Sequence, residues 1–206
     1  MYKKPKIIPS KANKEFLSHI DNLKNNLEKD DKIYYLDGCH PQHNPIVSNG
    51  WIKKGKCVEL KTNTGRKRLN LNGALNMNDV TDVIALSEDT ISSDETIKLL
   101  TEILKINEFG DIYLIADNTK YYKSKKVSEF CKENTRIKFI FLPPYSPNLN
   151  LIERLWLFFK KKILRNKYYE DFSEFKSKCL SFFKNIAIYK EELESLLTHN
   201  FNVMGS

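Results

Sequence analysis

Two aspartates that follow short apolar runs are the first residues whose type and position could do chemistry. The run 34–36 leads into Asp37, and the run 114–116 leads into Asp117. In open α/β sheets ligands bind at the carboxyl ends of strands, so two aspartates there could lie close together. Neighbouring carboxylates raise each other's pKa unless a cation lies between them, and Mg²⁺ and Mn²⁺ prefer carboxylate oxygens. The pair predicts a divalent-metal site, although an aspartate after a strand also commonly begins a turn.

A third acidic residue, Glu153, follows a proline-rich loop. The segment 141–156, FLPPYSPNLNLIERLW, joins a strand to a helix, because its three prolines cannot continue a strand ladder. Glu153 falls in the first helical turn, with Asn150 or Asn148 as the N-cap, at the edge of an apolar stripe that contains Trp156. From there its carboxylate could reach back over the sheet. The alternative is a glutamate that only interacts favourably with the helix dipole.

Two further groups could be mistaken for metal ligands. Cys39, His40 and His43 are close in sequence, but a closed zinc site needs four ligands and usually a second paired cluster, and the other cysteines are solitary. Zinc is therefore not expected. Asp111 precedes the same strand that Asp117 follows, roughly 20 Å away at about 3.3 Å per residue. We expect it at the opposite end of the sheet and dispensable.

Basic and aromatic residues directly after Asp117 are candidates for DNA contact. Tyr121 and Tyr122 could stack on splayed bases, although packing in the core is the stronger expectation. The four lysines could contact phosphates near the metals or simply form the solvated face of a helix: Lys120, Lys123, Lys125 and Lys126.

Hydrophobic periodicity divides the chain into strands and helices. The expected helices cover 15–27, 94–106, 124–134, a stretch from 151, 172–185 and 191–199, and the expected strands cover 32–36, 58–60, 69–75, 80–86, 112–116 and 137–142. The order is a β-meander followed by β-α-β-α-α. It predicts an α/β fold, a mixed sheet with helices on its faces, in one domain.

Composition excludes several classes of protein. The 206 residues carry a net charge of +8 with a pI near 9.1, which favours binding to polyphosphate. No run approaches the roughly 18 apolar residues of a membrane span, and the N-terminus has no signal-peptide pattern. The four cysteines lie far apart and indicate reduced thiols in a cytosolic protein rather than a disulfide framework.

Three motifs together resemble a known family. YLD at 35–37, IADN at 115–118 and LPPYSPNLNLIERLW at 142–156 are similar to the catalytic motifs of DDE transposases of the mariner superfamily, in particular the bacterial insertion-sequence IS-630 group. GRKRLNLNGALN at 65–76 resembles that family's second and third strands, and KKPKIIPSKAN at 3–13 its interdomain segment. The spacing between the acidic residues is also close to the family's. One departure is Leu151, where the family commonly has a proline.

The resemblance implies an RNase H-like fold, a mixed five-stranded sheet with helices on both faces. It implies a linker or arm over 1–13, the DDE catalytic domain over 14–200 and a tail over 201–206. Members of the family usually carry N-terminal helix-turn-helix modules that recognise the transposon ends. We expect this chain to lack them.

The resemblance also implies the chemistry. Asp37, Asp117 and Glu153 would be catalytic and would hold two Mg²⁺ or Mn²⁺ ions, for DNA strand cleavage and strand transfer by in-line attack of water or a DNA 3′-hydroxyl. The implied partners are double-stranded DNA, at transposon ends and target, and a second copy in a homodimer on the DNA. No membrane is expected, and the site of action would be the bacterial cytoplasm, at the nucleoid. Two alternatives stay open: a truncated, inactive remnant that binds DNA non-specifically, or another RNase H-like nuclease.

Overall fold

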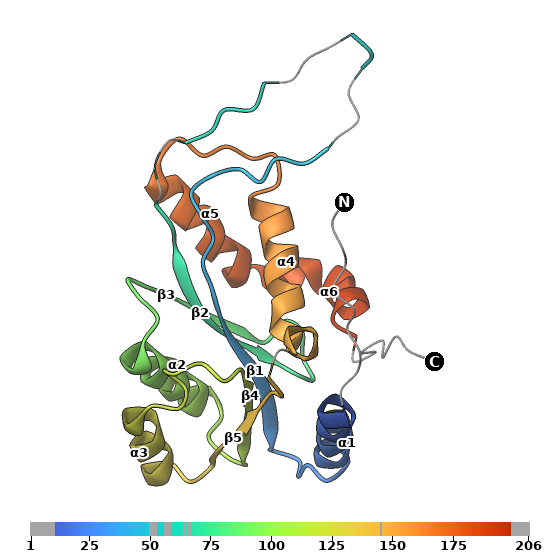
Figure 1. The fold of residues 1–206 in the computed structure, drawn as a ribbon, viewed down its shortest axis with the longest axis vertical. Coiled ribbons are helices and arrows are strands. Elements are labelled where there is room, and N and C mark those ends of the chain that lie inside the picture. Colours follow the sequence, from blue (N-terminus) through green and yellow to red (C-terminus); the bar gives the residue numbers. More distant parts are fainter. Residues whose placement is uncertain are drawn as a thin grey trace.

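The computed structural model describes residues 11–49, 53–55, 59–63, 65, 67–144 and 146–198. Its centre is a five-stranded sheet in the order β3-β2-β1-β4-β5 (Figure 1). The pairs β1–β2 and β2–β3 are antiparallel, and β1–β4 and β4–β5 are parallel, so the predicted mixed sheet is confirmed. The strands are β1 Lys32–Cys39, β2 Asn70–Asn76, β3 Val83–Glu88, β4 Ile112–Ala116 and β5 Ile137–Phe141.

Helices cover both faces of this sheet (Figure 1). Helices α2 (Ser93–Ile106) and α3 (Lys125–Glu133) pack on one face. The other face is covered by α1 (Lys11–Asn25), α4 (Leu151–Ile163) and α5 (Phe172–Lys184), with α6 (Lys190–Leu196) packed beside them. Short 3₁₀ turns, η1 and η2, occupy Pro147–Leu149 and Ile186–Tyr189. No helix of the described residues is long and apolar enough to cross a bilayer.

Strand β1 supplies side chains to both cores. Tyr34 and Leu36 are buried with α2 and α3, whereas Ile33 and Tyr35 are buried with α1, α4 and α5. The alternation follows from the two-residue period of a strand. Because helices cover both faces, the strand is apolar on both, which explains why its sequence is a continuous apolar run.

The prediction for β1 was wrong in its length, and Asp37 lies inside the strand rather than after it. Antiparallel pairing with β2 continues through Asp37↔Gly73 to Cys39↔Leu71. Parallel pairing with β4 ends earlier, at Tyr35↔Ile115. Pairing with β2 alone therefore extends β1 beyond the point where its pairing with β4 ends.

Other predicted elements also differ, and the strand predicted over 80–86 is β3, Val83–Glu88. Helix α1 begins at Lys11, so it takes in the last residues of the predicted arm, and the rest of that arm lies outside the described residues. The start of α1 is supported by a tertiary contact, since Ser146 Oγ donates to Asn13 Oδ1 at 2.7 Å. In the predicted strand 58–60, residue 58 lies outside the described part, and Glu59 and Leu60 belong to no strand.

The elements that lead to Asp117 follow their local signals closely. Strand β4 matches its prediction at both ends. Helices α2 and α3 start after serine caps, where Ser92 Oγ accepts from the N–H of Asp94 at 3.2 Å and Ser124 Oγ accepts from the N–H of Val127 at 3.3 Å. These caps satisfy backbone donors that a helix start leaves unpaired.

The starts of β1 and β4 are fixed to each other by a glycine turn. Gly110 has φ +77°, and a Cβ there would lie 2.4 Å from the backbone of Asp30. The N–H of Asp111 donates to Asp31 Oδ1 at 2.7 Å, and Asp111 O accepts from the N–H of Lys32 at 2.9 Å. The two central strands therefore run side by side from their first residues toward the acidic end of the sheet.

Candidate active site

Asp37 and Asp117 project from adjacent parallel strands toward the same helix layer. Ile33 and Tyr35 of β1 and Ile115 of β4 face α1, α4 and α5. Asp37 and Asp117 each lie two residues beyond the last pair, Tyr35↔Ile115. With a side-chain period of two, both carboxylates point to the α4 side of the sheet.

Two contacts position helix α4 so that Glu153 lies near these aspartates. Asn150 lies at the predicted N-cap position, but its side chain makes no cap bond; instead Asn150 Nδ2 donates to Leu36 O at 3.1 Å. That carbonyl directly precedes Asp37. Further along α4, Trp156 is buried over β2 against Gly73. Glu153, in the first turn, therefore lies above the acidic end of the sheet.

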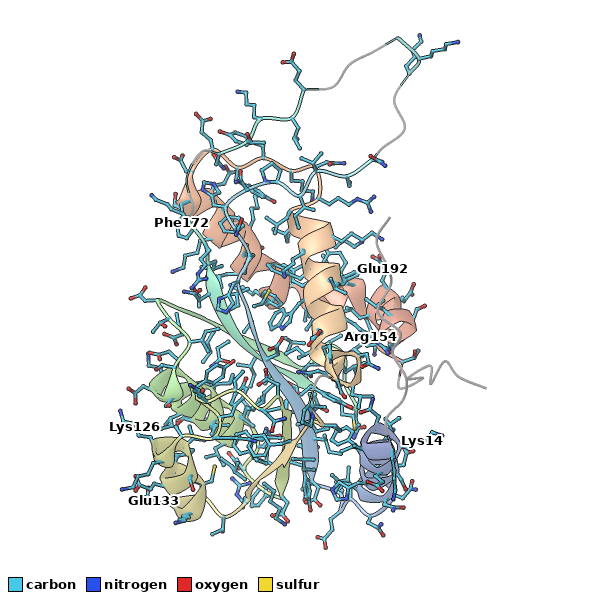
Figure 2. All side chains as sticks on the ribbon, in the orientation of Figure 1. Lys14, Lys126, Glu133, Arg154, Phe172 and Glu192 are labelled. Carbon is cyan, nitrogen blue, oxygen red and sulfur yellow. The ribbon has the colours of Figure 1, made fainter. Side chains whose placement is uncertain are left out.

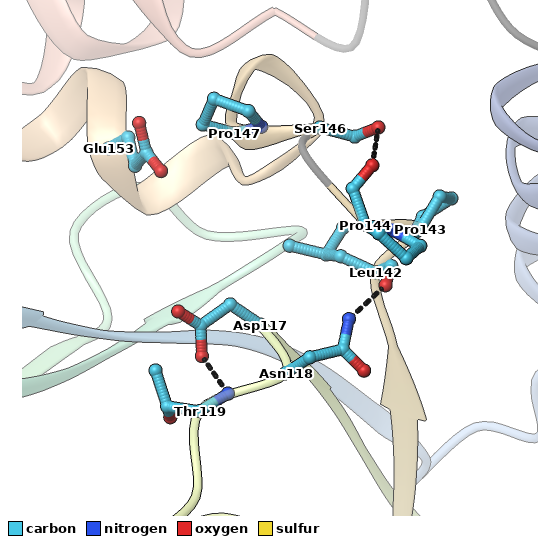
Figure 3. A pocket seen from close by; sticks show the side chains of 9 residues that line it. All are labelled: Asp117, Asn118, Thr119, Leu142, Pro143, Pro144, Ser146, Pro147 and Glu153. Carbon is cyan, nitrogen blue, oxygen red and sulfur yellow. Dashed lines mark hydrogen bonds between the residues drawn. The ribbon is translucent and has the colours of Figure 1, made fainter.

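A cavity of about 460 Å³ separates Asp117 from Glu153 (Figure 3). Its walls are tied together by hydrogen bonds. Thr119 N donates to Asp117 Oδ1 at 3.0 Å, and Asn118 Nδ2 donates to Leu142 O at 2.6 Å, which joins the ends of β4 and β5. The proline loop forms the remaining wall, and the described lining is Asp117, Asn118, Thr119, Leu142, Pro143, Pro144, Ser146, Pro147 and Glu153.

The surroundings of Asp37 raise the pKa of its carboxyl group. Burial raises the pKa of Asp37 from its ordinary value of 3.8 to about 7, and the negative charges of Glu153 and Asp117 raise it as well. The backbone N–H of Gly38 and the indole of Trp156 lower the pKa without offsetting the rise. Near neutral pH the site therefore has a strong affinity for either a proton or a cation.

Glu153 has the same character to a lesser degree. Burial and the charge of Asp117 raise its pKa, while Lys160 lowers it. Lys160 follows Glu153 by seven residues on α4, so both residues lie on one helix face. It is half-buried and is the cation that acts on this site from α4.

These side chains suit a hard divalent cation. All three candidate donors are carboxylates, and neighbouring negative charge adds to burial in raising the pKa values of Asp37 and Glu153. Among the described residues no three histidine, cysteine, aspartate or glutamate side chains are close enough together to enclose one ion. Asp117 and Glu153 line the cavity, and the charges of both raise the pKa of Asp37, which is not among the lining residues.

Comparison with protein families agrees with this arrangement. A model of the DDE superfamily endonucleases matches residues 32–176, from the start of β1 into α5. The chain belongs to the DDE superfamily endonucleases. The matched range contains all three acidic residues together with the proline loop, and it begins after α1.

Two curated relatives of this DDE domain come from bacteria. An insertion element IS630 uncharacterized 39 kDa protein of Shigella sonnei is 30% identical over 135 residues, which cover 65% of this chain and 39% of the relative. An uncharacterized protein y4pE/y4sA of Sinorhizobium fredii is 29% identical over 74 residues, covering 36% and 52%. The chain thus spans between two fifths and half of the length of the curated relatives that it matches.

Solved structures show the same fold. The Mos1 mariner paired-end complex with Mn matches with a TM-score of 0.65 at 14% identity, over 96% of this chain and 64% of that chain. The Mos1 transposase paired-end complex with the left transposon end matches with a TM-score of 0.62 at 14% identity, over 96% and 66%. The predicted RNase H-like transposase fold is thereby confirmed.

Asp111 and the residues considered for zinc have separate surroundings in this DDE domain. Asp111 begins the opposite end of β4 and pairs with Lys138 there. His40 Nδ1 lies 2.8 Å from Asn70 Oδ1, whereas His43 Nε2 lies 2.9 Å from Tyr169 O, and Cys39 is buried. Each of these three residues therefore has its own partner or its own place in the core.

The four candidate lysines divide into two kinds. Lys125 and Lys126 are engaged by acids, with Lys125 Nζ 3.6 Å from Glu129 and Lys126 Nζ 2.9 Å from Asp94 of α2. Figure 2 shows Lys126 on the outer end of α3, away from α4. Lys123 bonds to the side chain of Asn118, and Lys120 is exposed next to the cavity wall.

The structure adds residues that sequence reasoning missed. The side chain of Asn150 hydrogen-bonds to β1 instead of capping α4, and the ring of Trp156 lies against Gly73. Lys160 could have been found from its spacing of seven from Glu153, which repeats a helix face. Tyr122 is buried, as expected for a core residue, and its hydroxyl has no hydrogen-bond partner in the described part of the chain.

Proposed function

We propose that this domain is the catalytic domain of an insertion-sequence transposase, and that it carries out metal-dependent DNA strand cleavage and strand transfer. The observation that carries the proposal is the approach of Asp37, Asp117 and Glu153 to one cavity at the acidic end of a DDE-family sheet. The negative charges of Glu153 and Asp117 both raise the pKa of Asp37, and Asp117 and Glu153 line the cavity itself.

In this proposal the three carboxylates hold two Mg²⁺ or Mn²⁺ ions. Such ions activate an attacking oxygen and stabilise the leaving oxygen of a displacement at phosphorus. The protein's own contribution is to fix the carboxylates on rigid elements, β1, the end of β4 and α4. Lys160, whose charge already reaches Glu153, would contact the DNA backbone beside the ions.

The partners proposed are double-stranded DNA, at transposon ends and target, and a second copy of the chain on that DNA. Supporting this, the similar Mos1 structures are described as paired-end complexes with transposon ends. The net charge of +8 favours a polyanionic partner. The catalytic domain would span 14–200, and its place of action would be the bacterial cytoplasm at the nucleoid.

A plasmid-cleavage assay tests the proposed function. Supercoiled plasmid is incubated with the chain and Mn²⁺ or Mg²⁺, and labelled duplexes made from the DNA that flanks the gene are added as donors. We expect metal-dependent nicking that EDTA abolishes, and joining of the donor 3′ ends to the plasmid. Cleavage without joining would indicate another RNase H-like nuclease. DNA binding without cleavage in any divalent ion would indicate an inactive remnant.

DNA binding by this chain is predicted to be weak, tolerant of sequence and steeply salt-dependent. Phosphate contacts carry no sequence information, and each one contributes roughly 0.9 to the slope of log K against log salt. For about four contacts the affinity would fall roughly a hundredfold between 50 and 200 mM salt. Anisotropy titrations on two unrelated duplexes measure this, and tight, salt-insensitive preference for one duplex would contradict it.

The same titrations separate the candidate lysines. Lys120→Gln is expected to reduce the slope by about one, because it removes an exposed cation beside the cavity. Lys125→Gln is the matched control on the next helix. The ammonium of Lys125 already pairs with Glu129, so the salt slope of the Lys125→Gln variant should stay close to that of the unaltered chain.

A further inference from the structure

Gly73 lies directly across from Asp37 in the antiparallel pair β1–β2. A Cβ at this position would lie 2.5 Å from Cη2 and 2.6 Å from Cζ2 of Trp156. Real Cβ atoms do not approach other carbons so closely, so the indole ring occupies the space that a side chain would need. Only a glycine opposite Asp37 therefore leaves room for the Trp156 ring at this point of the sheet.

The edge of the ring that lies on Gly73 also carries an unusual donor, because Nε1 is only two bonds from Cζ2. Trp156 is 3% exposed, and its Nε1 has no hydrogen-bond partner among the described residues. A buried N–H left without an acceptor is destabilising, and such groups are rare in native proteins. Asp37 is the residue paired with Gly73, on which the ring lies, and the indole lowers the pKa of that carboxyl although no full hydrogen bond is made.

The helix joins this ring to the second acidic residue. Trp156 follows Glu153 by three residues on α4, so the two side chains lie on one face of the helix. The ring also packs against Phe183 of α5, with centroids 5.8 Å apart and an interplanar angle of 80°. Trp156 thus connects the floor at Gly73, the carboxylate of Asp37 and the helix that carries Glu153.

We propose that Trp156 is a positioning residue for the metal ligands, with Gly73 as its seat. When the carboxylates hold the ions, the indole N–H would donate to the Asp37 carboxylate, which would fix the rotamer of Asp37 and the distance of α4 from β1. This inference rests on the proposed function, because it assigns a role toward the ions of that site. Hydrogen bonds to metal-ligating carboxylates typically contribute tenfold to a hundredfold in metal affinity.

The indole proton itself reports on this bond. The chain has two tryptophans, so ¹⁵N-labelled Trp51→Phe protein gives one indole N–H signal, that of Trp156. On addition of Mg²⁺ we expect this signal to move downfield and its exchange with solvent to slow, and Mn²⁺ should broaden it. Asp111→Asn in the same background should behave identically, and Asp117→Asn should abolish the response.

Substitutions at the ring test its effect on the ions. Trp156→Phe keeps an aromatic ring but removes the donor, and we expect Mg²⁺ affinity, measured by melting-temperature titration, to fall tenfold to a hundredfold. Phe158→Leu, which loses core volume on the same helix against Phe182 and Tyr189, is the matched control and should retain its affinity. Gly73→Ala should weaken Mg²⁺ binding by displacing the ring.

The outcomes separate this inference from the proposed function. If Mg²⁺ raises the melting temperature but leaves the indole signal unmoved, the positioning role of Trp156 is wrong and the metal site stands. If Mg²⁺ changes neither, the metal site is wrong and the inference is overturned with it. Should Trp156→Phe fail to fold, the indole signal of the Trp51→Phe protein still decides the question.

Discussion

Asp117→Asn is expected to reduce DNA cleavage by about a thousandfold or more while leaving the fold intact. Metal ions supply several kcal/mol of charge stabilisation to such displacements, and each 1.4 kcal/mol corresponds to a factor of ten in rate. The substitution removes a full negative charge from the ligand set. It keeps an oxygen that can accept the hydrogen bond from the N–H of Thr119, so the turn after β4 should survive. Plasmid nicking rates in Mn²⁺ and circular dichroism spectra measure the two effects.

Asp111→Asn is the matched control for this prediction. It makes the same chemical change at the other end of β4, where Asp111 pairs with Lys138, so cleavage should proceed at close to the unaltered rate. Equal losses in the two variants would show that Asp117 acts only through general charge or stability. Retention of full activity in Asp117→Asn would remove it from the catalytic residues.

The second large effect concerns stability and pH in metal-free buffer. The pKa of Asp37 rises from 3.8 to about 7 on folding, chiefly through burial, so between these values the folded chain holds a proton that the unfolded chain has released. The free energy of unfolding should therefore be highest below about pH 4 as far as this group is concerned, and should fall as the pH rises toward 7. We expect a loss on the order of 2 kcal/mol, allowing for the partial solvent exposure of the carboxylate.

Metal ions should reverse this decline. They bind the ionised carboxylates of the folded chain, and at a hundred times Kd they stabilise it by about 2.7 kcal/mol, with the largest effect above pH 7. Urea denaturation at several pH values, with EDTA or with Mg²⁺, measures both effects. Asp37→Asn is the comparison. In EDTA its free energy of unfolding should change less across pH 4–7, and added Mg²⁺ should raise that free energy only weakly. The same slope in both proteins would mean that Asp37 is not the group that titrates.

Much of the surroundings of Asp117 and Glu153 could be predicted because the signals are local. Strand β4 is an unbroken apolar run, α2 and α3 begin at serine caps, and the prolines end β5 before α4 starts. Each of these signals lies within a few residues of the element that it defines. The family resemblance likewise rests on contiguous motifs.

The parts that could not be predicted depend on residues far apart in the chain. The extension of β1 through Asp37 needs its pairing with β2, and the tie of Asn150 to Leu36 spans 114 residues. Gly73 resembles a weak position in a strand until the ring of Trp156 is seen to lie on it. Neither periodicity nor local propensity carries information about such contacts, so the sequence predicts the candidate carboxylates but not what holds them in place.

Because α4 packs on α5, which is synthesised later, the position of α4 is fixed only near the end of synthesis. The aromatic face of α4 rests on α5, with Trp156 and Phe159 centroids 5.8 and 4.9 Å from that of Phe183. During synthesis Asp37 and Asp117 leave the ribosome well before the residues that hold Glu153 over them. A nascent or prematurely terminated chain without α5 would therefore have its aspartates but no fixed glutamate. We expect such fragments to leave DNA uncut, so that the proposed nuclease activity would be confined to chains that extend through Lys184.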